Sequence, residues 1–412
     1  MTAEDRCPVV HFDHNSAEHA ADPVASYRAL RNQDPVAYTE AHGGYWVLTG
    51  YQAVFEAARD DDVFSSARSG DGGEGLTVTI PKTPMHHHIP IEIDPPDFRK
   101  YRKILNAITS PAAIVDLIPR IEHHTTWFID RIIEQGHCDF GEIIGVPAIV
   151  TVEWLGLPIE EWSRYSFQHR MVLAAPKGSP DYVKATEVDL PYLTNQVHEV
   201  IAARRAEPRD DIISHLLAQE IDDRPIDDDE VFSMVELLLA GGTVTTSSLV
   251  SQALVWLFRH QDVRQRLIDQ PELRERAIEE FLRYFSPTQA LARTITTDTE
   301  FHGCPIRRGD RALLAWASAN RDAAGGFESP DELDIERWPN RHLAFGVGIH
   351  RCAGSHIARA LANEMIGQIL DRMPDYVVDT ERMVPFGNQG ANTGYSSIPA
   401  TFTPGRRVLV EA

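Results

Sequence analysis

Cysteine is scarce in this sequence, and no long apolar run is present. Four cysteines are spread over 412 residues without a Cys-x-x-Cys pair, namely Cys7, Cys138, Cys304 and Cys352. This spacing predicts a reducing compartment and no disulfide framework. The most apolar stretch, residues 143–157, contains Pro147 and Glu153 and is too short to span a bilayer. The first residues, MTAEDRCPVV, carry no basic segment before an apolar one. A cytoplasmic protein with no membrane association is therefore expected.

Basic residues are also in deficit. The chain has 39 Lys and Arg against 61 Asp and Glu, a formal net charge of −22. Because a nucleic-acid binder needs a basic face to neutralise phosphates, this balance argues against that class. Hydrophobic residues make up 43% and charged residues 24%, which is typical of a folded globular protein.

The periodicity along the chain predicts a mainly α protein with a small β region. Helices are expected over about 94–286 and 355–372, and strands over about 36–50, 289–310 and 375–412. Residues 61–93 form a long irregular segment, which inside a compact domain is usually a binding loop or lid. A helix is also expected around Leu313–Asn320. With no repeat or low-complexity linker, residues 1–412 are expected to form one domain, and the protein a monomer.

The longest expected helix runs from Asp227 to about Arg259 and would cross the whole domain. Its centre, LLLAGGTVTTSS, is unusual because each glycine in a helix interior costs about 1 kcal/mol relative to alanine. Gly241 and Gly242 therefore indicate a functional need, such as a local widening that admits a ligand or water.

The segment FGVGIHRCAG carries the strongest motif. Phe345, Gly348, His350, Cys352 and Gly354 lie at fixed spacings just before the helix expected from Ser355. A metal-ligating thiolate is stabilised by nearby backbone N–H groups and by a helix N-terminus, and glycines let the loop approach a flat ligand. Two other interpretations of Cys352 stay open on the residues alone. It can be a small buried hydrophobe, or, with His350 and His356, part of a zinc site that lacks a second cysteine pair.

This chain resembles the cytochrome P450 family of haem-thiolate monooxygenases in its soluble bacterial form. The resemblance covers essentially the whole length, through DPPDFRKYR (94–102), AGGTVTT (240–246), EEFLR (279–283), AWASANRD (315–322), DELDIERWPNRHLAFG (331–346) and FGVGIHRCAG (345–354). It implies the family's triangular, mainly α prism with a long central helix over a haem b. It also implies that Cys352 is the axial ligand of the iron, whose thiolate favours O–O cleavage.

The resemblance assigns further cofactor residues. Arg102, Arg293 and His350 match positions that contact the haem propionates, a task for which the planar charged fork of arginine is suited. The loop residues Phe345, Gly346, Ala353 and Gly354 match positions around the haem. Phe98 departs from the pattern, since many relatives have histidine there. Glu280 and Arg283 match a pair that braces the segment before the cysteine loop.

The oxygen-activating segment of the family matches Gly242, Thr245 and Thr246. The resemblance implies that the Thr245 hydroxyl stands beside the oxygen-binding site, whereas a threonine in a helix can also bond back to a carbonyl one turn earlier. Val244 replaces the family's acid and cannot relay protons. Proton delivery then relies on water, on a substrate hydroxyl or on another side chain.

Substrate contacts in the family come from four regions, and the matching candidates here are Ile91, Leu237, Ala240, Gly241, Leu291, Ala292 and Thr393. Their mostly apolar character indicates a small lipophilic substrate. The segments IPIEIDPP and TEFHG resemble those of terpenoid-hydroxylating relatives. The adjacent His86, His87 and His88 are candidates to anchor a polar group, but we expect them to be solvated, because three neighbouring histidines in a loop diverge.

We therefore expect an enzyme that uses O2 to hydroxylate or epoxidise a small lipophilic molecule. Because no flavin or iron–sulfur module is present, electrons should come from NAD(P)H through a ferredoxin reductase and a ferredoxin. A local basic face formed by Arg99, Lys100, Arg102, Lys103, Arg351 and Arg359 would steer an acidic ferredoxin. Two alternatives stay open: a peroxide-dependent or non-hydroxylating member, favoured by Val244, and a non-catalytic haem-binding sensor.

Overall fold

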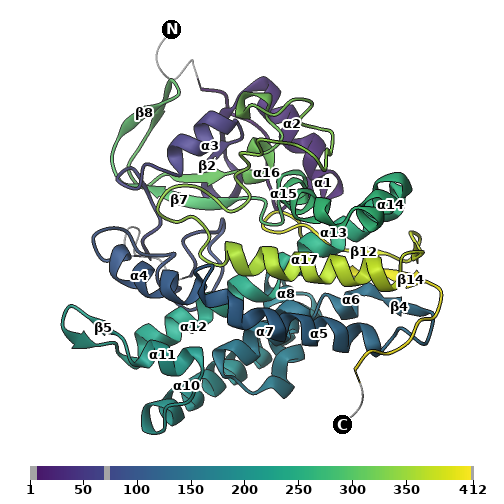
Figure 1. The fold of residues 1–412 in the computed structure, drawn as a ribbon. Helices are drawn as coiled ribbons and strands as arrows, with labels where there is room; N and C mark the ends of the chain where they lie inside the picture. The colour runs from purple at the N-terminus through teal and green to yellow at the C-terminus, as the bar shows by residue number, and fades with distance from the viewer. Residues whose placement is uncertain (1–6, 69–74, 410–412) are drawn as a thin grey trace.

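Helices make up the larger part of the structure, and a five-stranded sheet occupies one side of it (Figure 1). This computed structural model describes residues 7–68 and 75–409, so Met1–Arg6 and most of the SGDGGEG segment lie outside the described residues. The helices are α1 (Ala17–Ala21), α2 (Pro23–Gln33), α3 (Tyr51–Ala57), α4 (Phe98–Thr109), α5 (Ile118–Asp130), α6 (Phe140–Ile143), α7 (Val146–Leu155), α8 (Trp162–Ala174), α9 (Pro180–Val183), α10 (Leu190–Ala206), α11 (Ile212–Leu217), α12 (Asp228–Thr243), α13 (Thr245–Arg259), α14 (Gln261–Asp269), α15 (Arg274–Phe285), α16 (Trp316–Ala319) and α17 (Ser355–Arg372).

The strands are short and fall mostly in the regions expected to contain them. They are β1 (Val36–Thr39), β2 (Tyr45–Leu48), β3 (Phe64–Ser65), β4 (His137–Asp139), β5 (Glu220–Ile221), β6 (Arg224–Pro225), β7 (Leu291–Ile295), β8 (Thr299–Phe301), β9 (Cys304–Ile306), β10 (Arg311–Leu314), β11 (Val377–Val378), β12 (Val384–Pro385), β13 (Tyr395–Ser397) and β14 (Pro399–Thr401). The large sheet has the order β1-β2-β10-β7-β3, with only the β2/β10 pair parallel. The small strands β3, β4, β5 and β6 were not expected.

The helical part surrounds α12 and α13. Helix α12 packs against α7, α8 and α10, and α13 packs against α15 and α17. Helix α17 crosses the middle of the view, below the sheet and above α5 and α7 (Figure 1). The start of α12 is fixed by a capping box, in which the Asp227 side chain accepts from the Glu230 amide and Glu230 accepts from the Asp227 amide. The central helix pair is thus packed against other helices on several sides.

The expected helix from Asp227 to Arg259 is interrupted at Val244, where α12 ends and α13 begins (φ −113°, ψ −43°). The hydroxyl groups of Thr243, Ser247 and Ser248 each donate to a carbonyl oxygen one turn earlier. A hydroxyl that donates to a carbonyl one turn earlier competes with the backbone hydrogen bonds of the helix and bends it. The continuous helix is therefore replaced by two helices that meet at the site described below.

By length and composition alone, Asp228–Arg259 would be long and apolar enough to cross a membrane, and so would the bent pair Phe98–Thr109 and Ala113–Asp130 taken as one span. In the first of these, 67% of the apolar window is buried inside the protein. This degree of burial is the usual property of a core helix.

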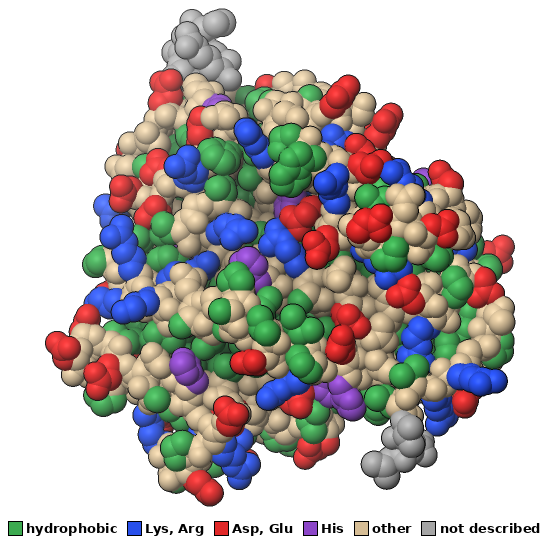
Figure 2. Space-filling model, in the orientation of Figure 1, with side chains coloured by type: hydrophobic (Ala, Val, Ile, Leu, Met, Phe, Trp, Pro, Cys, Tyr) green, Lys and Arg blue, Asp and Glu red, His purple; other side chains and the backbone are tan. Residues whose placement is uncertain are grey.

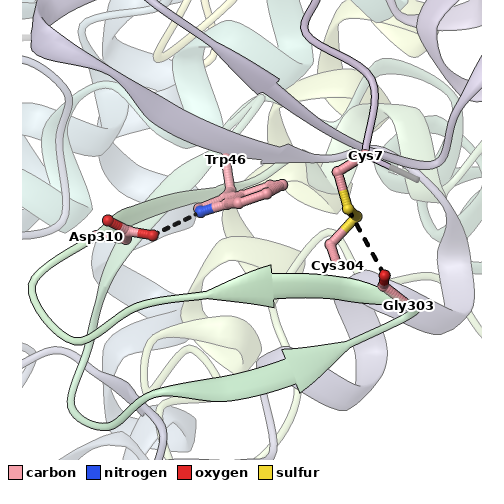
Figure 3. The surroundings of a disulfide bond; sticks show 5 residues. All are labelled: Cys7, Trp46, Gly303, Cys304 and Asp310. Carbon is pink, nitrogen blue, oxygen red and sulfur yellow. Dashed lines mark hydrogen bonds between the residues drawn. A yellow bond between two sulfur atoms is a disulfide. The ribbon is translucent and has the colours of Figure 1, made fainter. Parts of the chain in front are cut away.

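Two further expectations need correction. Residues 313–320 are not one helix: Leu313 and Leu314 complete β10, and α16 covers only Trp316–Ala319, because the sheet pairs β10 with both β2 and β7. Cys7 and Cys304 form a disulfide, although the spacing of the cysteines predicted none. Figure 3 shows this bond beside Trp46, whose indole N–H donates to Asp310 over 2.9 Å. The fold brings together two cysteines 297 residues apart, which sequence spacing does not reveal.

Candidate active site

The cysteine loop, residues 345–354, leads into α17 and closes on its own backbone. The Cys352 amide donates to the Phe345 carbonyl over 2.8 Å. Gly346 and Gly348 have φ of 66° and 80°, a left-handed conformation that glycine adopts without strain. A Cβ at Gly348 would stand 2.4 Å from the Ala58 carbonyl oxygen, so this glycine also lets the loop contact the end of α3. The result is a tight loop that places Cys352 just before a helix.

The Cys352 thiol is enclosed by protein and yet accessible. Burial raises its pKa, while the Gly354 amide and the charges of Arg102, Arg351 and Arg359 act in the opposite direction. The residue is nevertheless exposed. Accessibility and desolvation together describe a sulfur that faces an interior space. The surrounding donors and cations are those that stabilise a thiolate ligand.

That interior space has walls of bare backbone. A Cβ added at Gly241, Gly346 or Gly354 would meet no atom within 4 Å. Gly346 and Gly354 belong to the cysteine loop and Gly241 to α12. Ala353 packs against the apolar cluster that contains Leu239 of α12, so the loop and the helix belong to one region. The backbone of each of the three glycines therefore has open space beside it.

Of the three side chains assigned to the propionates, Arg293 and His350 have few polar partners of their own. Arg293 is 4% exposed, and its one side-chain hydrogen bond runs to the Ala292 carbonyl over 2.8 Å, with no carboxylate at ion-pair distance among the described residues. Burial lowers the pKa of Arg293 to about 10. The Nε2 of His350 is buried without a hydrogen-bond partner and lies 3.9 Å from Asp94 Oδ1. Arg102 donates through Nε to Asn106 over 2.8 Å. A bound group with carboxylates would satisfy these atoms.

These features fit a haem. The thiol can ligate the iron, and the glycines leave room beside the loop. The cationic and imidazole groups can bind the two propionates. Phe98, which stands in place of a histidine, packs edge-to-face on His350 with ring centroids 4.5 Å apart. This contact positions His350 although it supplies no hydrogen bond.

On the α12 side, the expected oxygen-activating residues separate into different environments. The Thr245 hydroxyl donates to the Gly241 carbonyl over 3.0 Å, the back-bonded arrangement. Thr246 is 4% exposed and faces the core. A Cβ at Gly242 would lie 2.6 Å from Thr151 Oγ1, so Gly242 permits close packing of α12 on α7. Of the two glycines, only Gly241 faces open space.

Val244 packs with Ala174 and Phe386 in a small apolar cluster. It also lines a cavity of about 320 Å³ that reaches the surface and that includes Arg170 of α8. The Arg170 Nε is buried without a partner, and burial lowers the pKa of this guanidinium. An acid at position 244 would share this cavity with Arg170, whereas valine leaves the cation unpaired.

The expected substrate residues differ in accessibility. Ile91, Leu237, Ala240 and Leu291 are partly accessible and Gly241 is exposed. Ala292, by contrast, is fully enclosed in the sheet. Thr393 is 7% exposed and accepts a hydrogen bond from Gln289 over 3.1 Å, which ties the last turn to the segment after α15.

The histidine run is not solvated as a whole. His88 is 3% exposed, and burial lowers its pKa to about 3. His86 lies within 3.0 Å of the Thr194 hydroxyl and packs edge-to-face on Phe232. The expectation was wrong for His88 because the loop folds inward onto α8, α10 and α12.

Glu92 is a residue that the motifs missed. Its side chain is fully buried and accepts from Arg68 (2.8 Å), the Thr77 amide (2.7 Å) and the His88 amide (2.9 Å). It therefore holds the irregular segment 76–93 in place. The sequence did contain a signal for a buried carboxylate, because Glu92 is a single acid between Ile91 and Ile93.

The Glu280–Arg283 pair is confirmed as a brace. Both side chains are 0% exposed and are joined by two hydrogen bonds of 2.7 and 2.8 Å. Arg283 also donates to the carbonyls of Asn320, Pro330 and Glu332, while Glu280 accepts from Arg337 and Asn340. The pair thus fixes residues 320–340, which lead to the cysteine loop.

Comparison with known proteins agrees with this site. A family model described as "Cytochrome P450" matches residues 184–374. The steroid C26-monooxygenase of Mycolicibacterium smegmatis is 34% identical over 93% of this chain and 94% of its own. The pentalenic acid synthase of Streptomyces avermitilis is 28% identical over 92% and 94%. The crystal structure of CYP109E1 from Bacillus megaterium in complex with testosterone superposes with a TM-score of 0.83, at 28% identity over 94% and 99% of the two chains.

The chain belongs to the cytochrome P450 family. It is a P450 monooxygenase with the P450 fold. The family implies a haem-thiolate cofactor, which when bound activates O2 for insertion of one oxygen atom into an organic substrate.

Proposed function

We propose that this protein hydroxylates or epoxidises a small lipophilic molecule, with Cys352 as the axial ligand of haem b. The observation that carries the proposal is the accessible Cys352, which three arginine charges and the Gly354 amide favour as a thiolate against the effect of burial, in a loop whose Gly346 and Gly354 have open space beside them. The apolar, partly accessible Ile91, Leu237, Ala240 and Leu291 support a lipophilic substrate. The relatives named for steroid oxidation and for pentalenic acid support a terpenoid or another natural product of that kind.

The chain's own residues divide the remaining work. Arg102, Arg293 and His350 hold the propionates, because buried Arg293 has one side-chain hydrogen bond, to the Ala292 carbonyl, and the His350 Nε2 has no hydrogen-bond partner. The Thr245 Oγ1 holds a proton beside Gly241, at the edge of the open space. With valine at position 244, water in the cavity lined by Arg170 and Ser247 supplies protons from the surface.

The test is the visible spectrum of the dithionite-reduced protein under carbon monoxide. Thiolate ligation gives a Soret band at about 450 nm, whereas a neutral thiol or an imidazole gives about 420 nm. Cys352→Ser should abolish the band at about 450 nm, while Cys138→Ser, which alters the other free cysteine, should keep it. A band at about 450 nm in Cys352→Ser would overturn the assignment.

Electrons come from a separate ferredoxin and its NAD(P)H-dependent reductase. Of the residues expected to form a basic face, Arg99, Lys103 and Arg351 are exposed. Lys100 is paired with Asp97 and Asp222, and Arg359 with Glu279. Figure 2 shows Lys and Arg side chains on the side of the molecule where α4 lies. Product formed with NADH and a ferredoxin pair supports this route, whereas product formed only with hydrogen peroxide would replace it with the peroxide-dependent alternative.

No product in either system, together with ligand-induced spectral shifts, would identify a haem-binding sensor instead. The protein is proposed to act as a cytoplasmic monomer. The Cys7–Cys304 disulfide is then an exception, because disulfides are rare in that compartment.

A further inference from the structure

Arg68 and Glu92 form an ion pair that connects the chain before the irregular segment 76–93 with the end of that segment. Arg68 Nη2 donates to Glu92 Oε2 over 2.8 Å, and the Glu92 side chain is 0% exposed. Because burying two charges costs nearly as much as their attraction returns, such a pair adds little net stability. Its effect on conformation is therefore the feature to explain.

The pair binds main-chain groups at four positions of the segment. The carboxylate accepts from the amides of Thr77 and His88 over 2.7 and 2.9 Å. The guanidinium donates to the carbonyls of Met85 and His86 over 3.3 and 2.8 Å. Buried main-chain groups need partners, and here one ion pair supplies them at four places. The conformation of the segment thus depends on two side chains.

Both ends of the segment meet residues assigned to the cofactor. Near its start, the Val78 carbonyl accepts from the Ala292 amide over 2.8 Å, directly before Arg293. After its end, Asp94 Oδ1 lies 3.9 Å from His350 Nε2. The segment therefore runs between two of the side chains that are proposed to hold the propionates.

Between these ends the segment contacts the helices. The His86 ring packs edge-to-face on Phe232 of α12, with ring centroids 5.0 Å apart, and its Nε2 lies 3.0 Å from the Thr194 hydroxyl of α10. Phe232 belongs to the same helix as the substrate candidate Leu237. Ile91, also a substrate candidate, is partly accessible and directly precedes the buried Glu92. The segment is therefore a wall of the proposed substrate space.

We propose that the Arg68–Glu92 pair determines the shape selectivity of the substrate space, by holding residues 76–93 in one conformation. The inference rests on the proposed function and concerns the same site. Both residues are positioning residues, since they act through Ile91 and its neighbours. A wall held in one conformation excludes ligands that do not fit it, whereas a loosened loop repacks around ligands of different shapes.

The test uses the haem-loaded protein and imidazole probes, whose ring nitrogen binds iron and changes the visible spectrum. Imidazole itself reports on the iron alone. The isomers 1-octylimidazole and 1-(2-propylpentyl)imidazole contain the same atoms, so the ratio of their Kd values measures selectivity for shape. We expect the wild type to distinguish the isomers by about tenfold or more.

Two variants loosen the segment to different degrees. Glu92→Gln replaces an acceptor oxygen by a donor that faces N–H groups, and should reduce the ratio to about two or less. Arg68→Lys keeps the charge but loses the planar fork that also reaches the two carbonyls, and should reduce the ratio by about threefold. The Kd of imidazole should stay unchanged in both. If Glu92→Gln does not fold, Arg68→Lys decides the question.

Asp130→Asn is the matched control. Asp130 of α5 is also a buried carboxylate that accepts from an arginine, Arg372, and from two amides, those of Val408 and Leu409. This variant should lose stability and keep the isomer ratio. A similar loss of the ratio in Asp130→Asn would overturn the inference, because the effect would then come from general destabilisation.

Two further results would overturn the inference: equal binding of the isomers by the wild type, or a ratio that persists in the folded variants of the pair. The reduced-CO spectrum separates these failures from a failure of the proposed function. A wild-type band at about 450 nm without isomer selectivity overturns this inference alone, whereas absence of the band overturns both.

Discussion

Arg283 illustrates how one residue can hold a distant loop. Its guanidinium is fully buried, is paired with Glu280 and donates to three backbone carbonyls of residues 320–332. Replacing both members of a buried pair with apolar groups can be neutral, but removing one member leaves an uncompensated charge. The position of the cysteine loop therefore depends on a side chain that does not touch the proposed cofactor.

Arg283→Ala is expected to lower the free energy of unfolding by about 3–5 kcal/mol, because buried Glu280 keeps only Arg337 and Asn340 as side-chain partners and three backbone carbonyls lose their donor. Arg266→Ala is the matched control, since Arg266 pairs with Glu336 at 2.7 Å but both side chains are more than 40% exposed. That change should cost no more than about 1 kcal/mol. Urea unfolding of the two variants gives the comparison, and similar losses would contradict the bracing role.

At the scale of the elements, α12 shows two adjacent glycines with different purposes. Gly242 lets α12 approach α7, whereas Gly241 faces the space above the cysteine loop. A sequence pattern treats the pair as one feature. The structure separates them because consecutive helix positions point about 100° apart.

Gly242→Ala is expected to destabilise the protein although alanine favours a helix by about 1 kcal/mol. The new methyl would meet Thr151 Oγ1 at 2.6 Å and Cγ2 at 3.1 Å. The double variant Gly242→Ala/Thr151→Ala removes both atoms and should recover stability relative to the sum of the single changes. A double-mutant cycle by urea unfolding measures this coupling. Additive effects would mean that the α12–α7 approach is not set by this contact.

At the scale of the whole molecule, the Cys7–Cys304 bond ties the start of the chain to the β8–β9 hairpin (Figure 3). Val9 also forms a β-bridge with Tyr38 of β1, so the N-terminal segment is held both to this hairpin and to the edge of the large sheet. A cross-link that closes so long a loop restricts the unfolded chain strongly.

Alkylation of the denatured, unreduced protein should label two thiols, Cys138 and Cys352, and reduction should expose two more. Reduction should also lower the free energy of unfolding by about 2–4 kcal/mol. In the Cys304→Ser variant, the free energy of unfolding should not change when reductant is added. The number of alkylated thiols is counted by mass spectrometry. Four labelled thiols without reductant would show that the pair stays reduced, as the cysteine spacing alone predicted.

The sequence by itself determined the features that depend on neighbouring residues. The capping box of Asp227 and Glu230 begins α12. The glycines of residues 345–354 and the start of α17 define the cysteine loop. Both features depend on interactions that act over a few residues. The Glu280–Arg283 spacing fixed the pair on one helix face.

Only the tertiary structure decided the burial of His88, the break at Val244, the contact of Gly242 with Thr151 and the pairing of Cys7 with Cys304. Each of these follows from packing between segments far apart in the chain. Local propensity contains no information about which distant surface a residue will meet.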